Sequence, residues 1–468
     1  MTRRWLLGGL LGFVVVLSFA TFRDAWVVNQ AGVLVNRAIV ARTAADEPGR
    51  RASAASTATV TSTGNLTRAM ALMETTALRA PHTSGREVPI WRTYGAAAAL
   101  APSEHAFQLL LDARDKNRLD RVGELWLGEV ASATEHWDQA AEAYRRVDAS
   151  NVLISRADAH LQAGEKTLAV RQYNLARISL EAAIERDTAE RLLSGGGGGA
   201  GSTTARFLTS DAERVTALYR IGRGLLAGGQ PRQAVPVLEQ AMERAATASP
   251  GAVVEQSLNL NLAFALAQTL PAPPPRATAS TRHSYYLDPP TEIYVSALVR
   301  VRTLVLRGTG SDRTASVCVQ AARSLLLIGD DDQAVSLLHA ALDLDPLLPD
   351  TYLVLGSWYE TKGMKVLPFE LYKKGAEQIP ANLQIAVAYA LASYKALPPD
   401  KALPVLERTA RTETKDPYLF AFLGDCYLDM GMSTEARAAY EEGLRRAPLA
   451  EPLLQRLAAL DEGVETAP

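Results

Sequence analysis

Residues 417–448 decide the fold, and they read PYLFAFLGDCYLDMGMSTEARAAYEEGLRRAP. Large apolar residues and small residues recur at the intervals that place them on one face of a helix. The residues that carry this pattern are Phe420, Leu423, Gly424, Tyr427, Gly431, Ala436, Tyr440, Gly443 and Pro448. Gly431 is placed to make a turn and Pro448 to end a helix. The stretch therefore predicts two antiparallel helices that pack closely through their small residues.

The same pattern returns upstream at a fixed period. Gly356 takes the place of Gly424 in an earlier copy, two periods back along the chain. The matching positions there are Tyr352, Leu355, Gly356, Tyr359, Gly363, Tyr372, Gly375 and Pro380. A further copy has Ala321, Ala322, Leu325, Gly329, Ala334, Leu338, Ala341 and Pro346, and a weaker one between the two has Tyr389, Ala390, Ala402 and Leu406. Copies with more drift begin near Trp91, Leu127, Ala157 and Leu218.

This pattern resembles the tetratricopeptide repeat (TPR), in which W-x2-L-G-x2-Y, a later A-x3-F pair and a proline recur about every 34 residues. The resemblance covers about residues 88–450, and the chain as a whole looks like a bacterial membrane-anchored TPR protein. It implies an all-α fold, a right-handed superhelical solenoid of antiparallel helix pairs, preceded here by an N-terminal transmembrane helix. Pro368 departs from the usual alanine, and insertions at 178–214 and 271–290 break the register.

Composition shifts divide the chain into six parts. Glycine runs and proline clusters mark the flexible connections. The expected parts are 1–22, a membrane anchor or signal segment; 23–87, an amphipathic helix, an Ala/Ser/Thr-rich spacer and a lead-in helix; 88–248, N-terminal repeats with a Gly-rich insertion at 194–202; 249–314, a degenerate repeat with a Pro-rich loop at 271–290; 315–450, the C-terminal repeat array; and 451–468, a capping helix and tail.

The N-terminal segment is apolar and follows two arginines. Residues 5–22 carry no charge, and Arg3 and Arg4 precede them. About 18 apolar residues are near the lower limit for crossing a bilayer, and the positive flank favours a cytoplasmic N-terminus. We therefore expect a single-pass cell-membrane protein whose repeat domain is extracytoplasmic. Two alternatives stay open, which are cleavage near Ala20 with export of a soluble binding protein, and a buried globular helix.

Charge and motif content disfavour several classes of function. The formal net charge is −2 and no long basic run occurs, so we expect no nucleic-acid partner. Cys318 and Cys426 are too few for a disulfide framework or a zinc site, and both are expected to be buried. Asp330, Asp331 and Asp332 are expected to begin a helix rather than bind a metal. We expect no enzyme activity, no cofactor and no metal. The alternative is an enzyme that uses the non-repeat insertions, with a candidate cluster at His283, Tyr285, Tyr286 and Asp288.

The resemblance also implies where partners bind. In TPR proteins, positions 2, 5, 9 and 12 of the first helix of each repeat line a concave groove. The corresponding residues are Ser316, Val319, Arg323, Leu326, Asp350, Leu353, Ser357, Glu360, Gln384, Val387, Leu391, Tyr394, Tyr418, Ala421, Asp425 and Leu428. This mixed lining predicts an extended or helical segment of another protein, held by apolar anchors. The alternative is a groove filled by the chain itself, through residues 24–44 or the proline loop.

The expected function is that of a scaffold anchored in the membrane through residues 5–22. Its partners are other proteins, in the assembly of an envelope complex, in secretion or in surface polymer export. The Lys and Asn pair with which one TPR subclass grips the C-terminal carboxylate of chaperones is absent, because the corresponding positions include Val319 with Arg323 and Leu353 with Ser357. We therefore predict no chaperone-tail clamp.

Overall fold

The structure of the chain is a computed structural model. It describes residues 30–31, 33–34, 67–71, 73–74, 87–193, 210–270, 289–310, 313–412 and 414–461. The chain divides into two compact units, Met1–Gln230 and Pro231–Pro468, which are called the N-terminal unit and the C-terminal unit below. Within the described residues every regular element is a helix, which confirms the all-α prediction.

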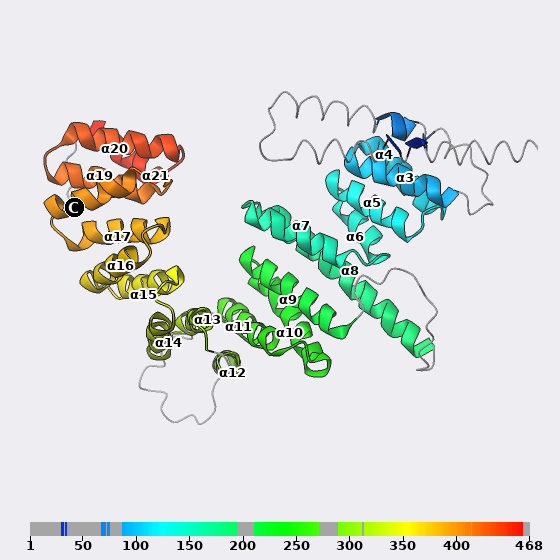
Figure 1. The fold of residues 1–468 in the computed structure, drawn as a ribbon, viewed down its shortest axis with the longest axis horizontal. Coiled ribbons are helices and arrows are strands. Elements are labelled where there is room, and N and C mark those ends of the chain that lie inside the picture. Colours follow the sequence, from blue (N-terminus) through cyan, green and yellow to red (C-terminus); the bar gives the residue numbers. More distant parts are fainter. Residues whose placement is uncertain are drawn as a thin grey trace, which may run out of the picture. The chain divides into compact units, whose positions relative to one another are not determined.

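Most helices follow one another with connections of a few residues, except between α8 and α9 and between α11 and α12 (Figure 1). Those of the N-terminal unit are α3 (Glu87–Leu100), α4 (Glu104–Asp115), α5 (Arg121–Ala133), α6 (Trp137–Arg145), α7 (Ser150–Gln162), α8 (Lys166–Leu193) and α9 (Asp211–Ala227). Those of the C-terminal unit are α10 (Pro231–Ala248), α11 (Ala252–Thr269), α12 (Pro289–Gly308), α13 (Ala315–Leu327), α14 (Asp331–Leu344), α15 (Pro349–Thr361), α16 (Val366–Gln378), α17 (Leu383–Ala396), α18 (Pro399–Ala410), α19 (Pro417–Asp429), α20 (Ser433–Arg446) and α21 (Glu451–Asp461).

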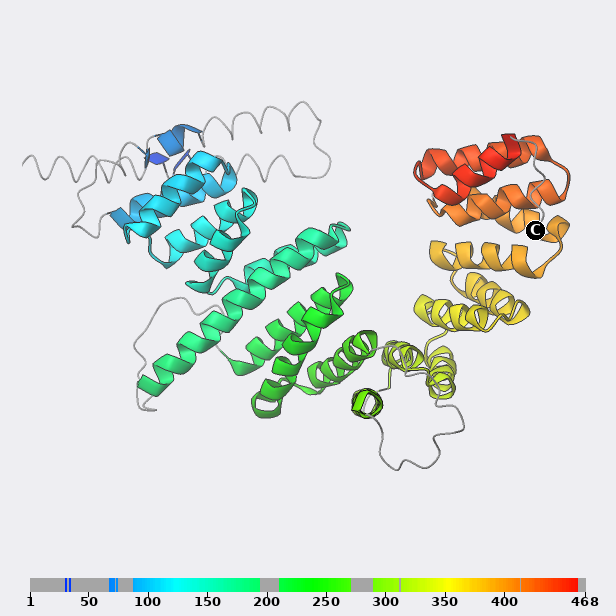
Figure 2. The same ribbon diagram turned by 180° about the vertical axis from the view of Figure 1, so that it is seen from behind.

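Helix pairs are the repeating unit of the C-terminal unit, and both ribbon views show their helices side by side (Figures 1 and 2). The first helix of each pair packs against its second helix, as α13 does with α14 and α19 with α20. Each first helix also packs against the first helix of the next pair, from α11 through α13, α15 and α17 to α19. The first helices therefore lie next to one another along one side of the array.

Glycines permit the turns and the close approach of the paired helices. Gly329, Gly363 and Gly431 have φ between 74° and 78°, a left-handed conformation that suits glycine and reverses the chain between paired helices. Gly424 lies under the ring of Tyr440, where an added Cβ would stand 2.1 Å from a ring carbon. The small residues predicted from the repeat thus allow the large ones opposite to be buried.

The last helix, α21, covers the end of the array. Leu453 is fully buried in a cluster with Phe420, Ala421, Ala436 and Tyr440. α21 packs against both α19 and α20, in the place that the first helix of a further repeat would take. It thereby removes the apolar end of the array from water, which the terminus of a stacked array requires.

The expected single-pass localisation is contradicted. Among the helices that the structure describes between residues 30 and 461, none combines the length and the apolar character that a membrane crossing needs. The prediction of a cytoplasmic N-terminus and an extracytoplasmic repeat domain anchored in the cell membrane is therefore wrong by this finding. Residues 5–22, on which that prediction rested, and the cleavage position near Ala20 lie outside the described residues.

Candidate partner-binding groove

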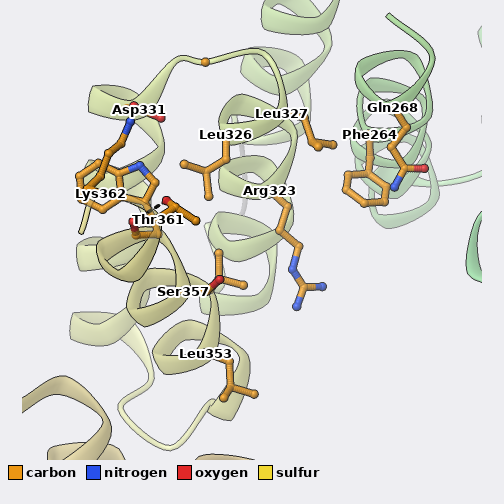
Figure 3. A pocket seen from close by; sticks show the side chains of 13 residues that line it. Phe264, Gln268, Arg323, Leu326, Leu327, Asp331, Leu353, Ser357, Thr361 and Lys362 are labelled. Carbon is orange, nitrogen blue, oxygen red and sulfur yellow. Dashed lines mark hydrogen bonds and ion pairs between the residues drawn. The ribbon is translucent and has the colours of Figure 1, made fainter. Parts of the chain in front are cut away.

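Three successive first helices of the C-terminal unit surround a cavity of about 710 Å³ (Figure 3). α11 contributes Phe264 and Gln268, whereas α13 contributes Arg323, Leu326 and Leu327. α15 and the residue after it contribute Leu353, Val354, Ser357, Trp358, Thr361 and Lys362. Gly329 of the turn between α13 and α14 and Asp331, the first residue of α14, complete the lining. The cavity thus opens on the side of the array where the first helices meet.

The walls of the cavity are mainly apolar. Phe264 of α11 and Leu327 of α13 point toward one another in Figure 3. Leu327 leaves 49% of its surface exposed, although it is a large aliphatic residue. Trp358 and Leu353 add half-buried apolar surface from α15. An exposed apolar recess of this kind, with polar groups on its border, is the usual form of a site that accepts large side chains of a partner.

Two paired cations stand at the border of the cavity. Arg323 Nη2 donates to Asp350 Oδ2 at 2.9 Å, and Lys362 Nζ donates to Asp331 Oδ2 at 2.5 Å. The hydrogen bond from Lys362 is the main reason why the pKa of Asp331 lies below its usual value. Both cationic side chains keep 43% of their surface exposed. Each can therefore still reach a ligand in the cavity, because an exposed ion pair contributes little to stability and is easily rearranged.

Four of the residues predicted for the groove line this cavity, namely Arg323, Leu326, Leu353 and Ser357. Others on the same two helices are differently placed. Ser316 is exposed and Val319 is buried on α13, while Asp350 and Glu360 are half-buried on α15. Glu360 pairs with Lys395 Nζ of α17 at 3.5 Å.

On α17 the predicted positions vary from exposed to buried. Gln384 is exposed, and Leu391 is half-buried. Val387 belongs to a buried cluster that includes residues of α18 and α19. The ring of Tyr394 stacks on Phe422 with centroids 4.9 Å apart, and its hydroxyl donates to Asp429 at 3.4 Å. These contacts tie α17 to α19.

On α19 the capping helix takes up part of the predicted surface. Tyr418 is 53% exposed, whereas Ala421 is fully buried beneath α21 and Leu428 is half-buried against the same cluster. Asp425 accepts hydrogen bonds from Arg456 of α21 and from the Tyr440 hydroxyl. The role of these four residues in binding a partner stays a prediction.

The sequence pattern missed several residues of the cavity. Phe264 and Gln268 lie on α11, in the repeat that the pattern described only as degenerate. The exposed Leu327 and Lys362 lie at the turn that follows a first helix, outside the four groove positions. The tryptophan Trp358, next to Ser357, was a signal that could have been used, because a half-buried tryptophan beside a groove position often anchors a partner.

The other predicted chemistry has a structural explanation or lies outside the described residues. Asp330 precedes α14, and Asp331 and Asp332 form its first turn, as expected for a helix start. Among the described residues, no group of three or more His, Cys, Asp or Glu side chains is placed to hold a metal ion. The alternative catalytic cluster of His283, Tyr285, Tyr286 and Asp288 lies outside the described residues. So do the proline loop, up to residue 288, and most of residues 24–44.

Both cysteines are buried, as predicted. Burial raises the pKa of the Cys426 thiol to about 11 and raises that of Cys318 as well. We expect neither thiol of the folded chain to react readily with a disulfide reagent at pH 8, because the thiolate is the reacting species. Both should react after denaturation, and an added Ser316→Cys thiol, exposed on the same helix as Cys318, should react at once. Rapid reaction of two thiols in the folded wild-type chain would contradict this.

Comparisons with known proteins agree with the repeat pattern. Residues 418–448 match the family model described as tetratricopeptide repeat. This match and the repeated helix pairs support the tetratricopeptide repeat family that the repeat spacing predicted. Arrays of this family present an extended surface for binding other proteins. A comparison with curated protein sequences gives no match.

Several solved structures are similar to parts of the chain. MamA is 24% identical over 30% of this chain and 83% of its own, with a TM-score of 0.28. PilF of Pseudomonas aeruginosa is 16% identical over 53% and 98%, with a TM-score of 0.37. Yeast Tom70 is 12% identical over 78% and 77%, with a TM-score of 0.35. All three TM-scores are below 0.5, so these similarities do not bear on what this chain binds.

Proposed function

We propose that the chain is a protein-binding scaffold whose C-terminal unit holds a segment of a partner protein between its first helices. The observation that carries this proposal is the cavity shared by α11, α13 and α15, with its exposed apolar wall at Leu327 and its paired cations at the border. In this proposal the first helices line the concave side of a right-handed superhelical array, and the cavity is the anchor point on it. Gln384, Leu391 and Tyr418 extend the same surface along α17 and α19.

The proposed binding mode follows from the size and chemistry of the cavity. A volume of about 710 Å³ is larger than one side chain requires, so it accommodates one or two large apolar side chains of a bound segment. Gln268, Ser357 and Thr361 supply polar groups at its border for the backbone of that segment. Most of the binding energy is expected from the apolar anchors, because a few buried contacts dominate such interfaces.

Site-specific photo-cross-linking tests this proposal in cells. A photoreactive residue replaces the exposed Ser357 of α15, and the matched control carries it at the exposed Ser336 of α14, a second helix. We expect a recurrent protein adduct from position 357 and not from position 336. Its identity would also decide among envelope complex assembly, secretion and polymer export, the processes expected from the sequence.

A pair of leucine substitutions makes the test specific. Leu327, which lines the cavity, is 49% exposed, and Leu344 of α14 is 52% exposed. Leu327→Asn is expected to reduce the adduct from position 357 about tenfold, because it removes an apolar anchor contact. Leu344→Asn should leave the adduct unchanged. Equal adducts from both serine positions, or an adduct that Leu327→Asn does not reduce, would refute the proposal.

A further inference from the structure

A tyrosine, a carboxylate and an arginine join successive repeats in several places. At the C-terminal end, the Tyr440 hydroxyl of α20 donates to Asp425 Oδ1 of α19 at 2.8 Å. Arg456 of α21 donates to the same carboxylate through Nε at 2.7 Å and through Nη2 at 2.8 Å. Asp425 of α19 is thus bonded to α20, the second helix of the same pair. It is also bonded to α21, which takes the place of the first helix of a following pair.

The same triad occurs twice in the N-terminal unit. Glu129 of α5 accepts from the Tyr144 hydroxyl at 3.1 Å and from Arg156 Nη2 at 2.6 Å. Asp158 of α7 accepts from the Tyr173 hydroxyl and from Arg220 Nη2, the latter at 2.6 Å. In all three triads the tyrosine follows the carboxylate by 15 residues. This constant spacing identifies the triad as a property of the repeat and not of one site.

One repeat keeps the tyrosine but lacks the carboxylate. Ser357 of α15 precedes Tyr372 of α16 by the same spacing and takes the carboxylate position. Tyr372 is only 4% exposed, and its ring packs against Gly356, as that of Tyr440 packs against Gly424. Within the described residues the Tyr372 hydroxyl has no hydrogen-bond partner, in contrast to the three triads. Ser357 itself is exposed and lines the cavity (Figure 3).

Three cations lie on or next to the first helices near Ser357. Arg323 and Lys362 line the same cavity as Ser357, and Lys395 lies on the following first helix, α17. Each is paired with one acid, and each leaves 42–43% of its side chain exposed. Glu360, an acid close enough to act on Tyr372 through its charge, pairs with Lys395. A carboxylate that enters beside Ser357 would therefore meet donors of the kind that the triads use.

We infer that the partner segment supplies this carboxylate. The bound segment has an Asp or Glu side chain beside Ser357, within reach of Arg323 and the Tyr372 hydroxyl, and a neighbouring large apolar side chain in the cavity next to Leu327. The inference rests on the proposed function, since it names the chemistry of the segment that the groove binds. The carboxylate fixes the register of the bound segment and selects for acidic segments, and the apolar side chain contributes most of the affinity.

Peptide selection on the full chain tests the inference. The probes are peptides selected from a phage-displayed random library, synthesised in pairs that differ only by Asp→Asn or Glu→Gln. We expect the selected peptides to share an acidic residue next to Leu, Phe or Trp, and the neutral member of each pair to bind about tenfold more weakly. Ser357→Asp places the missing carboxylate in the chain and should weaken the acidic peptides about tenfold. Ser357→Asn adds a side chain of the size of aspartate without its charge, and it is the reference against which that loss is measured.

The outcomes separate the two proposals. Ser357 is exposed, so both variants should keep the melting temperature of the wild-type chain, which is measured alongside. Suppose that the selected peptides lose binding to Leu327→Asn. If they then show no preference for an acidic residue, or bind Ser357→Asp as well as Ser357→Asn, the inference is wrong and the proposed groove function is unaffected. A selection that returns no peptide dependent on Leu327 overturns both.

Discussion

Replacing Leu453 by alanine is expected to lower the free energy of unfolding of the C-terminal repeats by about 2–5 kcal/mol. The side chain is fully buried between α21 and the pair α19–α20, against Phe420 and Tyr440. Its removal leaves a cavity at the contact that closes the array, so the cap and the last repeat loosen together. Denaturant unfolding and hydrogen exchange of the α19–α21 amides measure the effect.

The neighbouring leucine provides the control. Leu454 lies on the same helix and is 47% exposed, so Leu454→Ala should change stability by no more than about 0.5 kcal/mol. If Leu453→Ala and Leu454→Ala have equal effects, or if the α19 amides exchange as slowly as in the wild-type chain, then α21 does not stabilise the last repeat.

Replacing Gly424 by alanine is expected to cost about 2 kcal/mol. The added Cβ would lie 2.1 Å from Cε1 of Tyr440, a ring that is fully buried and has no room to withdraw. Overpacking of a core costs about 1–3 kcal/mol, and the short distance places this site at the upper end. The better helix propensity of alanine offsets about 1 kcal/mol of that cost. Thermal or denaturant unfolding of the full chain measures the net change.

Two comparisons show whether the ring is the cause. Gly310→Ala serves as the neutral case, because its Cβ would have only backbone atoms at 3.5 Å and 3.6 Å as neighbours. In a Tyr440→Leu background, where the ring is gone, Gly424→Ala should lose its cost and become neutral or stabilising by up to about 1 kcal/mol. An undiminished cost in that background would mean that the backbone at Gly424, and not Tyr440, sets the requirement for glycine.

The carboxylate Asp425 illustrates why a groove position cannot be assigned from register alone. The repeat pattern places it at the same position as Ser357 and Arg323, and the sequence offers no difference of role among them. In the structure, Asp425 is bonded to Arg456 and Tyr440, whereas Ser357 is exposed in the cavity. The difference between Asp425 and Ser357 comes from Arg456 of α21, which follows Asp425 by 31 residues. Such a contact depends on how the next helix packs.

The helix pairs and their turns could be predicted from the sequence alone. The spacing of Gly356, Gly424, Tyr372 and Tyr440 is a local property, because paired helices are close in the chain and their packing recurs with each repeat. The position of the cavity, in contrast, depends on how helices of different repeats pack together. The cavity joins Phe264 of α11 to Leu327 of α13 and Trp358 of α15, which are far apart in sequence. In the sequence of each helix these are ordinary apolar residues. The cavity exists only because the packing of α11, α13 and α15 leaves their side chains uncovered.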